Sequence, residues 1–216
     1  MTEPSPVRLV LASASPARLA TLRAAGLHPE VVVSGVDESG VEAPTVSELT
    51  ARLAALKAEA VADGLPERPG TTVVLGCDSL LELDGAPLGK PGTPERAVQR
   101  WRAMRGRSGT LHTGHHVLLR RGGGTRTAAA VAATTVHFAD LDDAEIDAYV
   151  ATGEPLQVAG AFTVDGLGGA FVRRVEGDHH NVVGVSLPLL RDLLAGLGVA
   201  WPTLWRPPPT DPPTAR

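Results

Sequence analysis

The chain has 216 residues, a formal net charge of −4 and 43% hydrophobic residues, enough to bury a sizeable core in one large domain or two small lobes. No basic block stands out, which argues against nucleic acid as a partner, and the single cysteine, Cys77, excludes an internal disulfide. No apolar run approaches the ~18 residues of a membrane span, and the first residues lack a signal-peptide pattern, so we expect a soluble, cytoplasmic protein.

Apolar periodicity and capping residues predict alternating strands and helices, which is typical of an α/β fold. Expected strands cover residues 7–12, 30–34, 71–83, 111–119 and 127–138, and further strands are expected around a glycine loop in residues 159–177. Expected helices cover residues 16–25, 46–64, 94–105, 142–151 and 187–198.

Local capping and turn signals predict the ends of several of these elements. Ser15 is a good N-cap for the first helix, and Thr45 with Glu48 forms a capping box ahead of the second. Asp84 and the glycine after it form the dipeptide favoured in two-residue hairpins. We therefore expect the strand at residues 71–83 to turn back there.

The chain shows no internal repeat and no domain linker. We therefore expect residues 1–200 to form a single domain, with two lobes around a central cleft. Residues 201–216 are rich in proline, and we expect this tail to be disordered.

The chain has only two lysines against eighteen arginines, and both lysines occupy unusual places. Lys57 lies beside the apolar stripe of its expected helix, and Lys90 follows a strand and a tight turn. Between them Asp78 stands in the middle of a hydrophobic strand, where an unpaired carboxylate would cost several kcal/mol. A GC-rich genome would explain the scarcity of lysine but not this placement. We therefore expect a site for an anion and a metal ion.

The turn before the first helix is a candidate phosphate site. The hydroxyl groups of Ser13 and Ser15 and the free N–H groups of the first turn can hold an anion near the positive end of the helix dipole. Arg18 would add positive charge. The alternative is an ordinary helix cap beside an exposed arginine.

Asp78 and Lys90 form a second candidate pair. A carboxylate can bind a divalent cation or orient water as a general base, and an ammonium group can neutralise charge on a phosphoryl oxygen. The alternative is a structural ion pair. Asp37 and Glu38 lie in an expected loop and offer more oxygen ligands for a hard cation, although acidic surface loops are common.

The histidines and the cysteine suggest a third, weaker possibility. His112 and His116 share one face of a strand, but the histidine spacing matches no known zinc pattern, so packed or solvated histidines are favoured. Cys77 is expected to be a small apolar filler beside Asp78 rather than a thiol nucleophile. A zinc or thiol hydrolase is therefore a minor alternative.

A series of sequence blocks resembles the Maf family. In chain order the blocks are LVLASASPARLATLRAAG, GVDES, LKAEAV, VLGCDSLLELDGAPLGKPGTPERA, EIDAYVATGEPLQVAGAFTVDGLGGAFV and GDHHNVVGVSLPLL, and they span residues 7–197. The ordered series is far more specific than any single block.

The resemblance implies a cytoplasmic nucleoside triphosphate pyrophosphatase, which cleaves between the α and β phosphates and releases the nucleoside monophosphate and pyrophosphate. It also implies an α/β fold with a mixed, twisted sheet and flanking helices, similar to inosine triphosphate pyrophosphatases, and often a homodimer. Mg²⁺ or Mn²⁺ is the expected cofactor, and neither nucleic acid nor a membrane is an expected partner. The family name derives from an effect on septum formation, so the alternative is a non-enzymatic nucleotide-binding regulator of cell division.

The resemblance also assigns roles to matching residues. Asp78 matches the acid assigned as proton acceptor; Glu38, Lys57 and Lys90 match polar pocket residues; and Arg18 matches the second arginine of the SxSPRR opening. Asp78 and Glu38 would hold the metal ion, while the cationic side chains would offset the charge of the triphosphate. Whether Asp78 is a metal ligand or a general base stays open.

The chain departs from the family pattern near positions linked to base choice. Ala17 replaces the first arginine, Ser79 stands where threonine is frequent, and Asp165 stands where some members have glutamine. An aspartate lacks the amide donor of glutamine, so we expect altered or broad base selection. The expected substrate-binding residues are Ser13, Ser15, Arg18, Ser79 and Asp165.

Overall fold

The computed structural model describes residues 7–205, and its centre is one sheet of seven strands. The strands lie in the order β2-β1-β3-β5-β6-β7, and β4 pairs with β3 beside this path. β1 is parallel to β2 and to β3, whereas the other pairings are antiparallel, so the predicted mixed sheet is confirmed. The strands are β1 Arg8–Leu11, β2 Glu30–Val31, β3 Thr71–Leu83, β4 Ala86–Leu88, β5 Ser108–Arg121, β6 Gly124–Phe138 and β7 Val172–Glu176.

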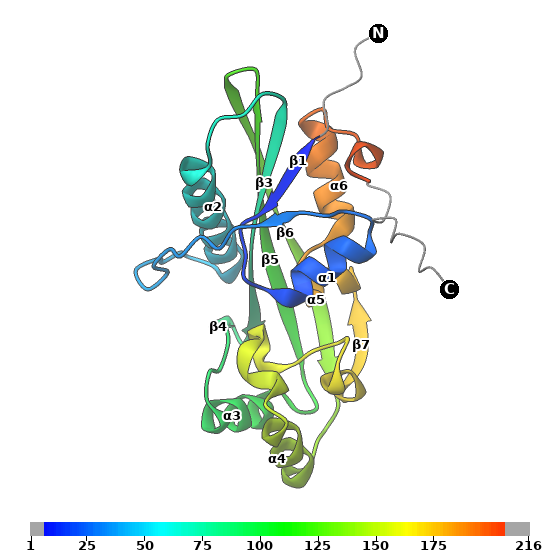
Figure 1. The fold of residues 1–216 in the computed structure, drawn as a ribbon. Coiled ribbons are helices and arrows are strands. Elements are labelled where there is room, and N and C mark those ends of the chain that lie inside the picture. Colours follow the sequence, from blue (N-terminus) through cyan, green and yellow to red (C-terminus); the bar gives the residue numbers. More distant parts are fainter. Residues whose placement is uncertain (1–6, 206–216) are drawn as a thin grey trace, which may run out of the picture.

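Helices cover both faces of this sheet. Figure 1 shows α2 against one face and α1, α5 and α6 against the other, while α3 and α4 lie at one end of the long strands. None of the helices within residues 7–205 is long and apolar enough to span a bilayer. The α-helices are α1 Pro16–Ala24, α2 Val46–Gly64, α3 Pro94–Met104, α4 Asp143–Ala151, α5 His179–Val183 and α6 Leu187–Gly196; the 3₁₀ helices are η1 Glu154–Gln157, η2 Ala159–Ala161, η3 Leu167–Phe171 and η4 Trp201–Leu204.

The predicted caps and the predicted hairpin are present. Ser15 Oγ accepts the backbone N–H of Arg18 at 3.4 Å, and Thr45 Oγ1 accepts that of Glu48 at 3.1 Å, which is one half of the predicted capping box. Asp84 and the glycine after it have φ angles of 53° and 77°, the left-handed conformation that a two-residue hairpin requires. β3 and β4 pair as this hairpin.

The structure corrects several predicted elements. The second strand extends only over Glu30–Val31, because the neighbouring β1 ends there. A strand was expected to begin within residues 159–171, but this stretch contains η2, a loop at residues 162–166 and η3, and the strand is limited to Val172–Glu176. Gly160 has a φ of 71° and turns the chain within η2. The sequence predicts no helix at α5, since five residues are too few to show a helical period.

The ordered chain also extends further than predicted. Trp201–Leu204 form η4, and Leu204 is buried in the core with 4% of its surface exposed. Trp205 pairs with Leu27 in a β-bridge. The start of the expected disordered tail is therefore wrong, while the rest of it, residues 206–216, lies outside the described residues.

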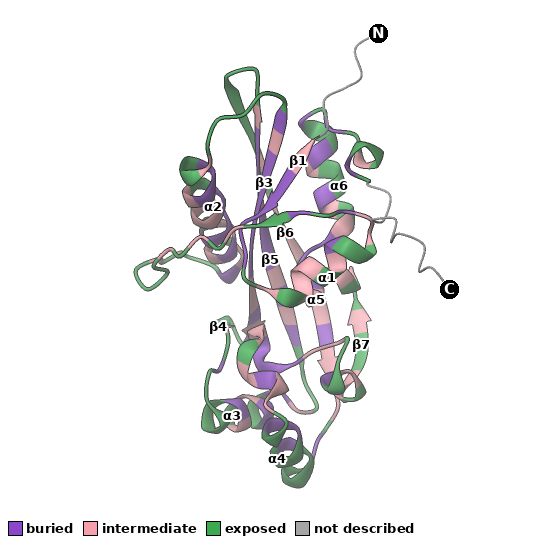
Figure 2. Cartoon of the chain, in the orientation of Figure 1, coloured by how far each residue is buried: buried purple, intermediate pink, exposed green. Residues whose placement is uncertain are grey.

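Two apolar clusters share one face of the sheet. The first packs α1 and α6 onto Leu75 and Cys77 of β3, and the second packs α3 and α4 onto Leu81 and Leu83. Figure 2 shows buried residues along the central strands at both ends of the sheet. Because side chains alternate along a strand, Ser79 lies on this same face between the two clusters.

On the opposite face, α2 packs closely on the strands at two glycines. A Cβ atom at Gly76 would lie 2.2 Å from the carbonyl oxygen of Ala54, and one at Gly114 would lie 2.2 Å from that of Thr50. Only glycine therefore allows the helix backbone to come this near the sheet. Asp78, two residues after Gly76, faces the same helix.

Candidate active site

The pairing of β3 is interrupted on one edge. β1 ends at Leu11, opposite Leu75, and β4 ends at Leu88, opposite Leu81. Within the described part of the chain, residues 76–80 have no strand partner on this edge, although β5 pairs with them on the other. The turns that follow β1 and β4 both begin beside this open edge, so polar side chains from several segments converge there.

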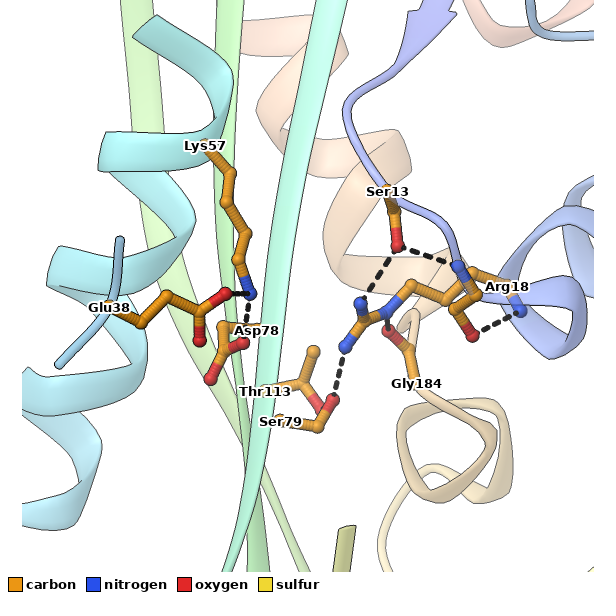
Figure 3. Close-up of polar contacts among 9 residues, drawn as sticks. Ser13, Arg18, Glu38, Lys57, Asp78, Ser79, Thr113 and Gly184 are labelled. Atoms are coloured by element: carbon orange, nitrogen blue, oxygen red, sulfur yellow. Dashed lines mark hydrogen bonds and ion pairs between the residues drawn. The ribbon is translucent and has the colours of Figure 1, made fainter. Parts of the chain in front are cut away.

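Asp78 forms a buried ion pair on the α2 face of the open edge. Lys57 Nζ lies 2.5 Å from Asp78 Oδ1 and 2.9 Å from Glu38 Oε1. The side chains of Lys57 and Asp78 are 12% and 11% exposed, whereas that of Glu38 is 46% exposed. Figure 3 shows the two carboxylates pointing toward the one ammonium group. The cation predicted to meet the buried acid is therefore Lys57, which the close seating of α2 brings to it.

Arg18 lies on the other side of β3 and is held at three points. Its Nε donates to the carbonyl of Gly184 at 2.7 Å, Nη1 to Ser13 Oγ at 3.1 Å and Nη2 to Ser79 Oγ at 2.9 Å. In Figure 3 these bonds fix the plane of the guanidinium group beside the strand. Arg18 is therefore half-buried in a bonded cluster and not exposed, although Ser15 does cap α1 as the alternative expects.

The two serines of the first turn also take part in this cluster. Ser13 is 8% exposed, and its Oγ accepts both the Arg18 guanidinium and the backbone N–H of Ser15 at 3.2 Å. Ser15 in turn caps α1. The structure thus brings together Ser13, Ser15, Arg18 and Ser79, four of the five residues of the expected substrate-binding set.

Lys90 and Asp165 are not drawn into these contacts. Both side chains are exposed, and among the contacts of residues 7–205 neither has a hydrogen bond or an ion pair. The predicted pairing of Lys90 with Asp78 is therefore absent. Lys90 nevertheless lies two residues beyond Leu88, and the register of β4 runs toward Ser79 at the open edge.

A thiol nucleophile at Cys77 and a metal ligand at His115 find little support in the geometry. Cys77 is fully buried, and burial raises the pKa of its thiol to about 12, so it stays protonated at neutral pH. His115 is 1% exposed, and burial lowers its pKa to about 4. The Nε2 atom of His115 accepts the N–H of Ser186 at 2.9 Å, and its Nδ1 lies 2.9 Å from the carbonyl of Thr113, so both ring nitrogens are occupied.

Two further acidic residues, Asp37 and Asp178, accept hydrogen bonds from backbone N–H groups close to them in the sequence. Asp37 is exposed, and its Oδ1 accepts the N–H of Ser39 at 2.9 Å, a bond that lowers its pKa. Asp178, His179 and His180 place their ligating atoms within 4.8 Å of one another. Asp178 Oδ1, however, already caps α5 by accepting the N–H of His180. Neither group belongs to the cluster at the open edge.

Sequence reasoning missed two groups of the site, Gly184 and Thr113. Gly184 contributes only a carbonyl, which no side-chain pattern reveals. Thr113 Oγ1 lies 2.9 Å from Ser79 Oγ. In the sequence Thr113 lies between His112 and His115, and only the histidines of this segment were considered as functional residues. The strand pairing that sets Ser79 opposite Thr113 was the missing information.

These features define an α/β protein with a cluster of bonded charged side chains on both sides of the central strand β3. The sequence profile of the family described as Maf-like protein matches residues 8–197. This chain therefore belongs to the Maf-like protein family.

Curated relatives resemble this chain over nearly its whole length. A protein of Salinispora tropica called nucleoside triphosphate pyrophosphatase is 59% identical over 93% of this chain and 88% of its own length. A protein of Streptomyces coelicolor with the same name is 58% identical over 93% of this chain and 95% of its own length. Among solved structures, one described as the structure of the Staphylococcus aureus Ham1 protein aligns at 17% identity with a TM-score of 0.45, over 88% of this chain and 99% of that one.

Proposed function

We propose that this protein hydrolyses nucleoside triphosphates between the α and β phosphates, releasing a nucleoside monophosphate and pyrophosphate. The names of its curated relatives support this activity. The observation that carries it is the buried Asp78, paired with Lys57 on one face of an open strand edge while Arg18 faces the other side. A triphosphate placed across this edge meets the general base Asp78 on one side. It meets a fixed cation on each side, Lys57 on one and Arg18 on the other.

The acid–base step is assigned to Asp78. Its carboxylate accepts a proton from the attacking water, and the contact with Lys57 orients the group. Arg18 offsets negative charge on the phosphates from the opposite side of the strand. Lys90, unpaired among the described residues, approaches from the end of β4 and neutralises charge on the leaving pyrophosphate.

A divalent cation is part of this proposal. Asp78 and Glu38 each place one carboxylate oxygen on Lys57 Nζ, and their second oxygens, Asp78 Oδ2 and Glu38 Oε2, would hold Mg²⁺ or Mn²⁺, which prefer oxygen ligands. When bound, the cation supplies charge neutralisation for the phosphate oxygens. Glu38 is 46% exposed, so it has the freedom to turn toward a cation.

Recognition of the nucleotide base is assigned to Asp165, whereas Ser79 acts on the substrate through Arg18. Asp165 is exposed, so its carboxylate accepts hydrogen bonds from donors on a base edge rather than offering the amide donor of a glutamine. Altered or broad base selection is the proposed result. We further propose that the protein acts in the cytoplasm as a homodimer, which light scattering on the purified chain checks.

The test measures pyrophosphate and orthophosphate released from a panel of canonical and modified nucleoside triphosphates with Mg²⁺ or Mn²⁺. Wild type is compared with Asp78→Asn, which keeps the shape of the side chain and removes its charge. A matched control is Asp192→Asn on the exposed face of α6. We expect pyrophosphate as the product, a loss of ~10² or more in Asp78→Asn, and no change in the control.

Other outcomes point elsewhere. Wild-type turnover in Asp78→Asn would contradict the assigned mechanism. Detectable nucleotide binding without any product from the wild-type protein would favour the non-enzymatic regulator of cell division.

A further inference from the structure

A chain of hydrogen bonds runs from Arg18 into the core between the two apolar clusters. Arg18 Nη2 lies 2.9 Å from Ser79 Oγ, which lies 2.9 Å from Thr113 Oγ1. Thr113 Oγ1 lies 3.2 Å from the carbonyl oxygen of Asn181 on α5. Thr113 and Asn181 are completely buried, so water does not replace these bonds. Figure 3 shows Ser79 and Thr113 together beside the strand.

The direction of every bond in this chain is determined by its two ends. A guanidinium group only donates, and a carbonyl oxygen only accepts. Thr113 must therefore give its one hydroxyl hydrogen to Asn181, and Ser79 must give its own to Thr113. Ser79 Oγ is left as the acceptor of the Arg18 hydrogen, so the hydroxyl next to Asp78 has a fixed orientation.

We propose that Thr113 is a positioning residue, which orients Ser79 and, through it, holds the Arg18 guanidinium group for the triphosphate. A guanidinium group has five N–H hydrogens, and Arg18 uses three of them on Gly184, Ser13 and Ser79. The other two are then presented to an anion in a fixed direction. The inference rests on the proposed pyrophosphatase function, and Thr113 itself, fully buried on β5, touches no substrate.

The anchor behind Thr113 is rigid. Asn181 Nδ2 lies within hydrogen-bond distance of the carbonyls of Leu111 at 3.1 Å and Ala132 at 3.3 Å, on β5 and β6. α5 is therefore fastened to two strands, and the Gly184 carbonyl at its end binds Arg18 Nε. Two of the three bonds that hold the arginine, those to Gly184 and to Ser79, therefore lead back to the same short helix.

The test compares Thr113→Val, which keeps the volume and removes the hydroxyl, with Thr113→Ser, which restores it. The control is Thr71→Val on β3, where a buried threonine hydroxyl accepts Arg121 Nε at 2.8 Å at the far end of the strand. We measure kcat and KM for a hydrolysed triphosphate and calorimetric binding of an α,β-methylene triphosphate. Melting temperatures identify any variant that does not fold.

We expect Thr113→Val to raise KM and weaken analogue binding about tenfold, with a smaller change in kcat, while Thr113→Ser stays near wild type. The Thr71→Val control should lose some stability but no affinity. Because Thr113 acts through Ser79, the double variant Ser79→Ala with Thr113→Val should bind no more weakly than Ser79→Ala alone.

Affinity in Thr113→Val equal to that of Thr71→Val, or additive losses in the double variant, would overturn the inference. Should Thr113→Val fail to fold, Thr113→Ala and the Ser79→Ala cycle give the same comparison. If wild type binds the analogue but hydrolyses no triphosphate, the proposed function fails while the binding data still decide the role of Thr113. If wild type neither binds the analogue nor hydrolyses a triphosphate, both the proposed function and the role of Thr113 are overturned.

Discussion

Asp78 and Ser79 are consecutive on β3, yet their side chains lie on opposite faces of the sheet, Asp78 against Lys57 and Ser79 against Arg18. The alternation of a strand causes this separation, and within residues 7–205 no strand pairs with residues 76–80 on this edge, which leaves the edge open between the two faces. A ligand that lies across the edge contacts both groups at once. The site therefore depends on a break in the sheet as much as on its side chains.

The seating of α2 on Gly76 controls the distance between Lys57 and Asp78. We expect Gly76→Ala to destabilise the protein by about 3 kcal/mol and to lower turnover at least ~10-fold, because the added Cβ would lie 2.2 Å from the Ala54 carbonyl. Gly64→Ala, at the open end of the same helix, meets no atom within 4 Å among the described residues and should be neutral. Thermal unfolding and initial rates test both; an unimpaired Gly76→Ala would refute this role of the helix.

Glu154 fastens the loop that carries Asp165. Its carboxylate accepts the backbone N–H groups of Leu167 and Gly168, both at 2.9 Å, and the hydroxyl of Thr163 at 2.6 Å. Burial opposes ionisation, but these bonds hold the pKa of Glu154 below its ordinary value. One ionised group therefore orders the whole loop.

Glu154→Gln should loosen this loop at a cost of ~2 kcal/mol, because an amide cannot accept all of these bonds. We expect faster hydrogen exchange at Leu167 and Gly168 and a flatter ranking of bases in the triphosphate panel. Glu67→Gln, on the exposed segment between α2 and β3, is the control. Protection of the two amides as in wild type would show that the loop is held by other contacts.

His115 makes stability depend on pH. Its pKa is about 4 in the folded protein because of burial, against ~6.5 when exposed. Between these values the unfolded chain binds a proton that the folded protein excludes, so this contribution is intact above pH 6.5 and falls by ~3 kcal/mol as the pH drops to 4. As the pH is lowered from 7.5 to 4, the melting temperature of His115→Gln should fall less steeply than that of wild type. Equal slopes would mean that other groups cause the acid sensitivity.

The C-terminal segment divides into a required part and a dispensable part. Deleting the residues after Pro207 should leave activity and melting temperature nearly unchanged. Deleting everything after Ala200 removes Leu204 and Trp201 from the first apolar cluster, which should cost about 3 kcal/mol and lower the Tm by about 6–12 °C. Calorimetry of the two truncated chains checks this, and equal melting temperatures would show that η4 adds nothing to stability.

Local signals in the sequence predicted most of the fold. Caps and turns depend on neighbouring residues alone. The caps at Ser15 and Thr45 and the turn at Asp84 could therefore be predicted without a tertiary structure. The short β2 and the 3₁₀ turns after Ala159 were not, because their form depends on where β1 ends and on how Gly160 packs against Leu81.

The candidate site was predicted in part. The scarcity of lysine and the buried position of Asp78 pointed to a cation, and the structure places Lys57 there. The same reasoning chose Lys90, whose exposed side chain makes no such contact within residues 7–205. The sequence predicts that a buried carboxylate needs a cationic partner. It does not predict which of the two lysines lies next to that carboxylate in the folded protein.

The sequence by itself determined which chemical groups are present, where strands and helices begin, and, through an ordered series of blocks, the family. Only the tertiary structure decided that Asp78 and Ser79 serve opposite faces, that Gly76 admits α2, and that Thr113 lies behind Ser79. The physical reason is that caps and turns arise from neighbours along the chain. Pairing between β3 and β5 and the seating of α2 arise instead from segments that meet only when the sheet forms.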